Sequence, residues 1–116
     1  MTHLLEDDVE QYLAQLQRVL KPGGRALTTW FLLEEDARRR IAAGESGLAF
    51  LDPENHVAVV SEDMPEEAVA YDEGWVYDHV KEMDLAIVEP VHPGAWCGRA
   101  DARSFQDLVV LEKPAR

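Results

Sequence analysis

The chain has 116 residues, which is enough for one domain with a modest core, and its formal net charge is −12. This acidic balance disfavours phosphate backbones and anionic lipid surfaces, so we expect neither nucleic acid nor a membrane as a partner. A single cysteine excludes an intramolecular disulfide, and no basic region followed by an apolar run marks a signal peptide. We therefore expect a cytoplasmic protein.

The first predicted element is an amphipathic helix near the start of the chain. Acidic residues occupy its first turn and Arg18 lies near its last turn, as the helix dipole favours. Pro22 then ends the helix, and Gly23-Gly24 permits a turn with positive φ. The helix carries one apolar stripe, formed by Val9, Tyr12, Leu13, Leu16, Val19 and Leu20.

Strands and helices then alternate. The apolar run at residues 26–33 predicts a strand that is covered on both faces, and residues 34–43 predict a short helix. Two short apolar runs, residues 48–51 and 56–60, flank a turn sequence and predict a hairpin. Residues 61–71 are acidic and indicate a loop.

The last third of the chain predicts one more helix and two more strands. Asp72 is a suitable N-cap for a helix that runs to about residue 83. Apolar residues at 85–91 and 105–112 predict strands, and the segment between them contains two glycines and indicates a loop.

This order of elements resembles the C-terminal half of class I S-adenosylmethionine-dependent methyltransferases. The phrases that carry the resemblance are Thr2-His3-Leu4-Leu5, Arg18-Val19-Leu20-Lys21-Pro22-Gly23-Gly24, Met83-Asp84-Leu85 and Phe105-Gln106-Asp107-Leu108-Val109-Val110. Asp84 departs from the family, which usually has glycine there, although aspartate also enters the left-handed region.

The resemblance implies an α/β fold over a single domain, residues 1–116, with a partial Rossmann-like architecture. It implies a three-stranded mixed sheet in which the last strand is central and antiparallel, with flanking helices and an inserted hairpin. It also implies S-adenosylmethionine as cofactor. However, the family's glycine-rich loop follows a strand, whereas Gly23-Gly24 precedes one, so the sequence lacks most of a cofactor site.

Two pairs of candidate site residues follow from the resemblance. Thr2 and His3 would lie beside the reactive end of the cofactor, Thr2 as a cofactor contact and His3 as a catalytic base; the alternative is a frayed chain end. Trp30 and Phe31 end the first predicted strand and would wall the acceptor pocket; the alternative is that both are core aromatics.

The loop between the last two strands supplies the remaining candidates for substrate binding. His92, Trp96 and Arg99 lie there, and Trp96 would stack on a substrate while Arg99 would pair with an anion. The alternative is a purely structural loop. Cys97 has no basic neighbour that activates a thiol, and the four histidines lack the spacing of metal ligands, so no metal site is predicted.

Two functions remain open at this stage. The first is the acceptor-side half of a methyltransferase that acts on a small molecule and is not expected to be competent alone. The second is a non-catalytic module, derived from that fold, that oligomerises and binds a small ligand or a protein. In the parent fold the strand at 26–33 has a further neighbour, so we expect an exposed apolar edge here and a homodimer or higher oligomer through it.

Overall fold

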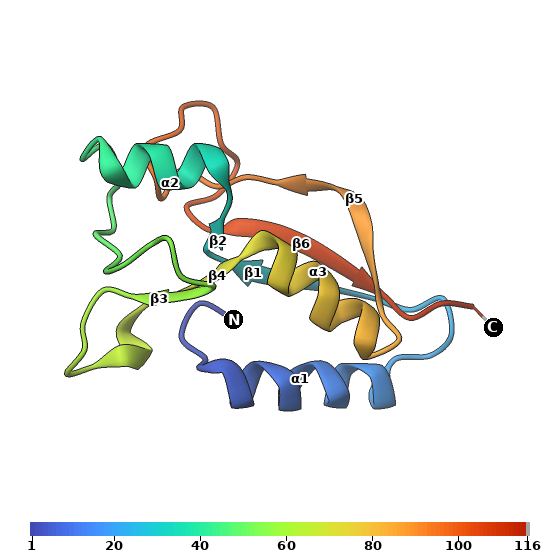
Figure 1. The fold of residues 1–116 in the computed structure, drawn as a ribbon. Coiled ribbons are helices and arrows are strands. Elements are labelled where there is room, and N and C mark those ends of the chain that lie inside the picture. The colour runs from blue at the N-terminus through green and yellow to red at the C-terminus, as the bar shows by residue number, and fades with distance from the viewer. Residues whose placement is uncertain (116) are drawn as a thin grey trace.

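The computed structural model describes residues 1–115, which form an α/β domain with two three-stranded sheets (Figure 1). Among these residues, no helix has both the length and the apolar character that a membrane span requires. The elements in chain order are α1 (Glu6–Val19), β1 (Arg25–Trp30), β2 (Leu32–Leu33), α2 (Glu35–Ala42), β3 (Val57–Val59), the 3₁₀ helix η1 (Pro65–Glu67), β4 (Val69–Asp72), α3 (Glu73–Glu82), β5 (Ala86–His92) and β6 (Asp107–Glu112).

The first sheet has the strand order β1-β6-β5. Its central strand β6 is antiparallel to both neighbours, with Leu111 opposite Ala26 on β1 and opposite Ile87 on β5. This confirms the predicted order, in which the last strand lies in the middle. Because both pairs are antiparallel, this sheet is antiparallel, and the prediction of a mixed sheet is wrong for these three strands.

The second sheet is the mixed one and has the order β2-β4-β3. Strand β2 pairs with β4 in parallel, and β3 pairs with β4 in antiparallel orientation. The predicted hairpin is therefore wrong: residues 48–51 form no strand, and the partner of β3 comes from the segment that was expected to be a loop. The buried residues Val69, Ala70 and Tyr71 belong to that partner strand. The strand was not predicted because acidic residues precede it and make the whole segment resemble a loop.

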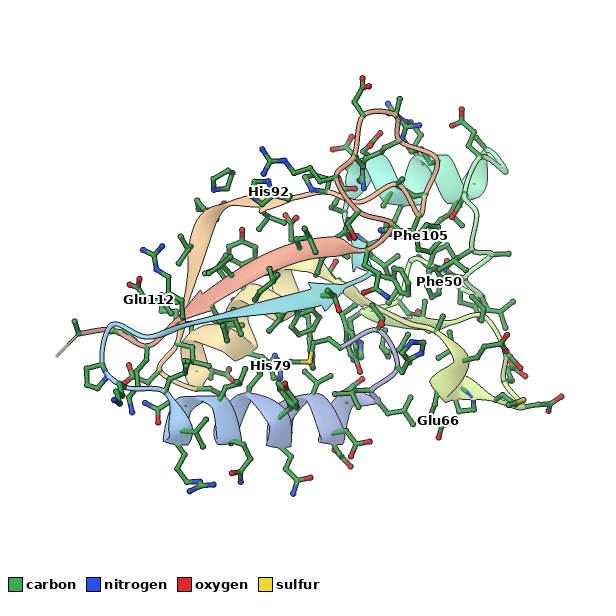
Figure 2. The ribbon with its side chains drawn as sticks, turned by 180° about the vertical axis from the view of Figure 1, so that it is seen from behind. Phe50, Glu66, His79, His92, Phe105 and Glu112 are labelled. Atoms are coloured by element: carbon green, nitrogen blue, oxygen red, sulfur yellow. The ribbon has the colours of Figure 1, made fainter. Side chains whose placement is uncertain are left out.

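The run at residues 30–33 is buried because its side chains enter two different cores. Trp30 and Leu32 belong to the core that α1 and α3 form on the first sheet. Phe31 and Leu33 belong to a second core beside α2. The expectation that the whole strand is covered on both faces is wrong for its first half, where Leu27 is 66% exposed. In the described residues no helix covers the face of the first sheet that Leu27 shares (Figure 2).

The turns that the sequence predicts are present. After α1, Gly23 has a φ of +80° and its N–H donates to the carbonyl of Lys113, which ties the turn to the end of β6. After α3, Asp84 has a φ of +56°, so the aspartate takes the left-handed conformation in the position where the family usually has glycine.

Asp72 caps α3 and also holds α2 through an ion pair. Its carboxylate accepts a hydrogen bond from the Trp75 N–H (3.1 Å), and its other oxygen lies 2.8 Å from Arg38 Nη2. We expect Asp72→Ala to lower the free energy of unfolding by about 1.5 kcal/mol, because the cap and the partly exposed ion pair are both lost. Denaturant unfolding measures this change.

The control for this prediction is Asp72→Asn, which keeps an acceptor for the Trp75 N–H but removes the charge. We expect this variant to lose no more than about 0.5 kcal/mol. Equal losses in both variants would mean that the ion pair, and not the cap, stabilises this end of α3.

Candidate functional site

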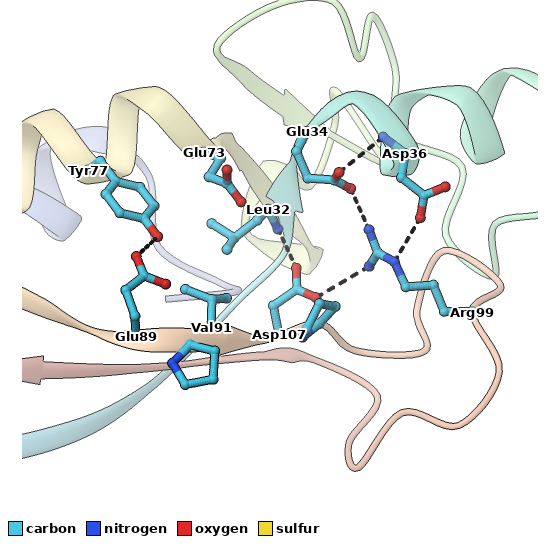
Figure 3. A pocket seen from close by; sticks show the side chains of 11 residues that line it. Leu32, Glu34, Asp36, Glu73, Tyr77, Glu89, Val91, Arg99 and Asp107 are labelled. Atoms are coloured by element: carbon cyan, nitrogen blue, oxygen red, sulfur yellow. Dashed lines mark hydrogen bonds and ion pairs between the residues drawn. The ribbon is translucent and has the colours of Figure 1, made fainter.

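A pocket of about 410 Å³ opens where the two sheets meet (Figure 3). Its lining includes Glu34, which follows β2 directly, and Glu73 at the start of α3, which follows β4 directly. The pocket thus lies at the carboxyl ends of the parallel strands β2 and β4, the edge at which open α/β sheets bind ligands. The apolar part of its wall is formed by Leu32, Pro90, Val91 and Pro93.

Most polar side chains of the pocket are carboxylates, and these five come from four parts of the fold. They are Glu34 and Asp36 at the start of α2, Glu73 at the start of α3, Glu89 on β5 and Asp107 at the start of β6. Glu34 also caps α2, because its side chain accepts hydrogen bonds from the N–H groups of Asp36 and Ala37. Two strand–helix junctions and two strands therefore bring these carboxylates together around the pocket.

Arg99 is the single cation in the pocket lining, and three carboxylates surround it. It forms ion pairs with Glu34 and with Asp36 (Nε to Oδ2, 3.0 Å), and its Nη1 lies 3.7 Å from Asp107 Oδ1. Its side chain is only 14% exposed. Burial of Asp36 raises its pKa, but the bonds from Arg40 and Arg99 prevail and hold that pKa below its usual value. The charge of Arg99 is thus already neutralised within the protein.

Asp107 lies at the floor of the pocket and joins three segments of the chain. Its Oδ2 accepts hydrogen bonds from the Leu32 N–H (2.7 Å) and from the Trp96 indole N–H (3.0 Å). Its Oδ1 accepts one from the Gly94 N–H (2.6 Å). Burial raises the pKa of this carboxyl, and the donors and Arg99 oppose that rise. Asp107 therefore holds β2 and the 93–106 loop against β6.

The opposite wall of the pocket carries carboxylates that no arginine neutralises. Within residues 1–115 the Glu73 side chain makes neither a hydrogen bond nor an ion pair, and burial together with the charges of Glu34 and Glu89 raises its pKa. The Tyr77 hydroxyl donates to Glu89 Oε1 (2.6 Å). Burial and this bond raise the pKa of Tyr77, so the phenol stays protonated as a donor.

The arrangement favours a ligand that carries positive charge and has an apolar body. Each anion brought into the pocket would meet several carboxylates, whereas a cation would meet the two that lack a counter-charge. In residues 1–115 no three His, Cys, Asp or Glu residues are grouped so that they could hold a metal ion.

Of the predicted substrate-binding residues, Arg99 lines this pocket, but its partners are carboxylates of the protein itself. Trp96 and Phe31 are buried in the second core, with ring centroids 5.4 Å apart. Trp30 is buried in the first core, where its indole N–H donates to Thr28 Oγ1 (2.8 Å). His92 ends β5 and is half-buried, and it is not among the pocket residues.

The two candidates at the N-terminus lie outside the pocket. Thr2 is buried; its carbonyl accepts a hydrogen bond from the Val69 N–H (2.8 Å), and its hydroxyl accepts one from the Gln106 amide (3.3 Å). His3 is exposed, with Nδ1 3.0 Å from the carbonyl oxygen of Glu67. The structure thus places Thr2 against β4 and the end of the 93–106 loop, and His3 against η1, and neither residue lines the pocket.

Sequence reasoning missed the carboxylates of the pocket. A signal for them exists, because an acidic residue follows directly after β2 and after β4, and another begins β6. Polar residues at the carboxyl ends of strands are the ones to examine in an α/β fold. The signal was hidden because β2 and β4 are too short to be predicted as strands.

No family model matches this chain, and no solved structure matches it. The function is therefore argued from the pocket and from the order of the elements.

Proposed function

We propose that this chain binds a small organic cation in the pocket between its two sheets. The observation that carries the proposal is the excess of carboxylates there: five line the pocket against one arginine, which is itself held by three of them. Glu73 and Glu89 are left to meet a ligand, and an ammonium group between them would relieve the repulsion that raises the pKa of Glu73.

The apolar wall of the pocket determines which uncharged part the ligand should have. Leu32, Val91 and the two prolines offer a surface for methylene groups, and the hydroxyl of Tyr77 fixes the side chain of Glu89. Small-molecule sites combine such an apolar lining with a few placed polar groups. An alkylamine of a few carbon atoms therefore fits better than a compact inorganic ion.

We also propose that the domain corresponds to the acceptor side of a class I methyltransferase-like fold. Supporting this proposal are the strand order β1-β6-β5, with an antiparallel central strand, and the Pro-Gly-Gly turn before β1. The pocket would then be the acceptor site. The second candidate is a binding module of the same origin without catalysis, and the same pocket would serve it.

The residues present do not fit S-adenosylmethionine. The described glycines include no glycine-rich loop between a strand and a helix: Gly23 and Gly24 precede β1, and Gly74 stands alone after the acidic residues Asp72 and Glu73. Such a loop is what allows a backbone to approach this kind of cofactor closely. Methyl transfer would therefore require a cofactor loop supplied from outside the described residues.

A matched set of four-carbon ligands tests the proposed cation site. Putrescine, 1,4-butanediol and succinate have similar length and carry positive, zero and negative charge. We expect putrescine to shift the backbone NMR signals of Glu73, Tyr77 and Val91 in a saturable titration, whereas the other two do not. Equal shifts with succinate, or none with putrescine, would refute the cation site.

Calorimetry with S-adenosylmethionine tests whether the chain holds the cofactor by itself. For the chain alone we expect no heat of binding at millimolar cofactor, because a glycine-rich loop is missing among the described residues. Micromolar binding would show that the chain holds the cofactor by itself, and it would favour a complete methyltransferase over a binding module.

A further inference from the structure

Strand β1 is an edge strand with an unpaired side. In the described part of the chain its only strand partner is β6, on the opposite side. The Lys113 N–H donates to the carbonyl of Gly24, so by alternation Ala26 and Thr28 also direct their backbone groups toward β6. The N–H and C=O groups of Arg25, Leu27 and Thr29 therefore point away from the sheet.

Apolar side chains accompany this open edge. Leu27 is 66% exposed on the uncovered face of the sheet, and Tyr12 and Val19 of α1 are 49% and 60% exposed. Helix α1 runs alongside β1 in both views (Figures 1 and 2), and Tyr12 and Leu27 line one shallow groove with Met1 and Thr29. Unpaired strand edges with exposed apolar residues are sites at which a further strand adds.

We propose that a second copy of this chain occupies this edge, with the two β1 strands pairing antiparallel about a two-fold axis at Leu27. In this arrangement Leu27 exchanges both backbone hydrogen bonds with the partner's Leu27, and Arg25 does so with the partner's Thr29. An antiparallel pair of identical strands is self-complementary, so every outward-facing group of the three residues is satisfied.

The distribution of charge argues for a second copy over a basic partner. The chain carries 23 acidic and 11 basic residues, yet β1 contains no carboxylate and one arginine. Two copies of such an acidic chain repel each other across most of their surfaces, and strand β1 itself brings no carboxylate to a contact between them. A basic protein would instead be drawn to the acidic surfaces elsewhere.

The side chains around the axis also match. On the uncovered face Leu27 lies opposite Val110 of β6, which lies opposite Val88 of β5. Pairing through β1 extends this apolar row across the axis into the same row of the partner. The edge is about 20 Å long, from six residues at about 3.4 Å each, which makes a small interface.

Sedimentation velocity of the full chain over a concentration series tests the proposal. We expect a monomer–dimer equilibrium, and we expect Leu27→Lys to weaken it by at least ~100-fold, because two ammonium groups would then face each other at the axis. The matched control is Val88→Lys on β5, the far edge of the same face, which should leave the equilibrium unchanged. Circular dichroism verifies that both variants are folded.

A second readout does not depend on variants. Hydrogen exchange should slow with rising concentration at the amides of Arg25, Leu27 and Thr29 and stay constant at Ala26 and Thr28, which already bond to β6. A chain that is monomeric at all concentrations would overturn the proposal. So would a dimer that Val88→Lys abolishes and Leu27→Lys does not, because that dimer would form through β5, at the far edge of the sheet.

Discussion

Asp107→Ala is expected to lower the free energy of unfolding by about 4 kcal/mol. The substitution leaves three buried donors without an acceptor, namely the N–H groups of Leu32 and Gly94 and the indole N–H of Trp96. Each unsatisfied buried donor costs about 1–3 kcal/mol. Because a domain of this size has only about 5–15 kcal/mol in total, the variant should be close to unfolding at ambient temperature. Urea denaturation followed by tryptophan fluorescence measures the change.

Asp107→Asn is the matched control, because asparagine keeps the shape and one acceptor oxygen. Its single amide oxygen replaces one of the two carboxylate oxygens as acceptor, and its NH2 group cannot accept the remaining N–H. We therefore expect the free energy of unfolding to fall by about 2 kcal/mol. A second control is Glu112→Ala at the other end of β6, where the exposed pair with Arg25 should contribute less than about 1 kcal/mol. A loss in Asp107→Ala as small as that in Glu112→Ala would mean that the three donors find other acceptors.

The second large effect is expected for ligand binding. In the double variant Glu73→Gln/Glu89→Gln the two carboxylates without a cationic partner become neutral amides of the same size. We expect putrescine affinity to fall by about 100-fold, which corresponds to about 2.7 kcal/mol. The measurement is an NMR titration at fixed ionic strength. The control is Glu82→Gln, which removes a single negative charge at an exposed position at the far end of α3.

The pH dependence of this binding follows from the raised pKa of Glu73. A cation binds the ionised carboxylate, so binding releases a proton wherever Glu73 is protonated in the free protein. Affinity should therefore fall as the pH is lowered through the raised pKa of Glu73, above the range where ordinary glutamates titrate. This part of the pH dependence should vanish in Glu73→Gln. An unchanged pH profile in that variant would place the cation elsewhere.

The parts of the fold that the sequence predicted are those that local residues specify. The apolar stripe and Pro22-Gly23-Gly24 define α1 and its turn, and Asp72 defines the start of α3. Strand β6 was placed in the centre of its sheet through the resemblance, and the observed order agrees. These features depend on a few neighbouring residues or on a long apolar run.

The second sheet and the pocket could not be predicted in the same way. Its strands have two to four residues, and their pairing joins Leu32 to Tyr71, far apart in the sequence. A short strand has no periodicity to detect, so tertiary contacts decide its existence. The pocket depends on this pairing, because β2 and β4 bring Glu34 and Glu73 to the same edge. Arg99, which was expected to meet an anionic ligand, is instead surrounded by Glu34, Asp36 and Asp107.

The short run from Trp30 to Leu33 has a mechanical consequence. Its side chains alternate between two cores, so the backbone at the floor of the pocket is anchored from both sides. The two sheets cannot swing apart around this segment without withdrawing an aromatic ring from one core or the other. This wall of the pocket is therefore fixed in place, and a ligand is expected to adapt its shape to it and not to displace it.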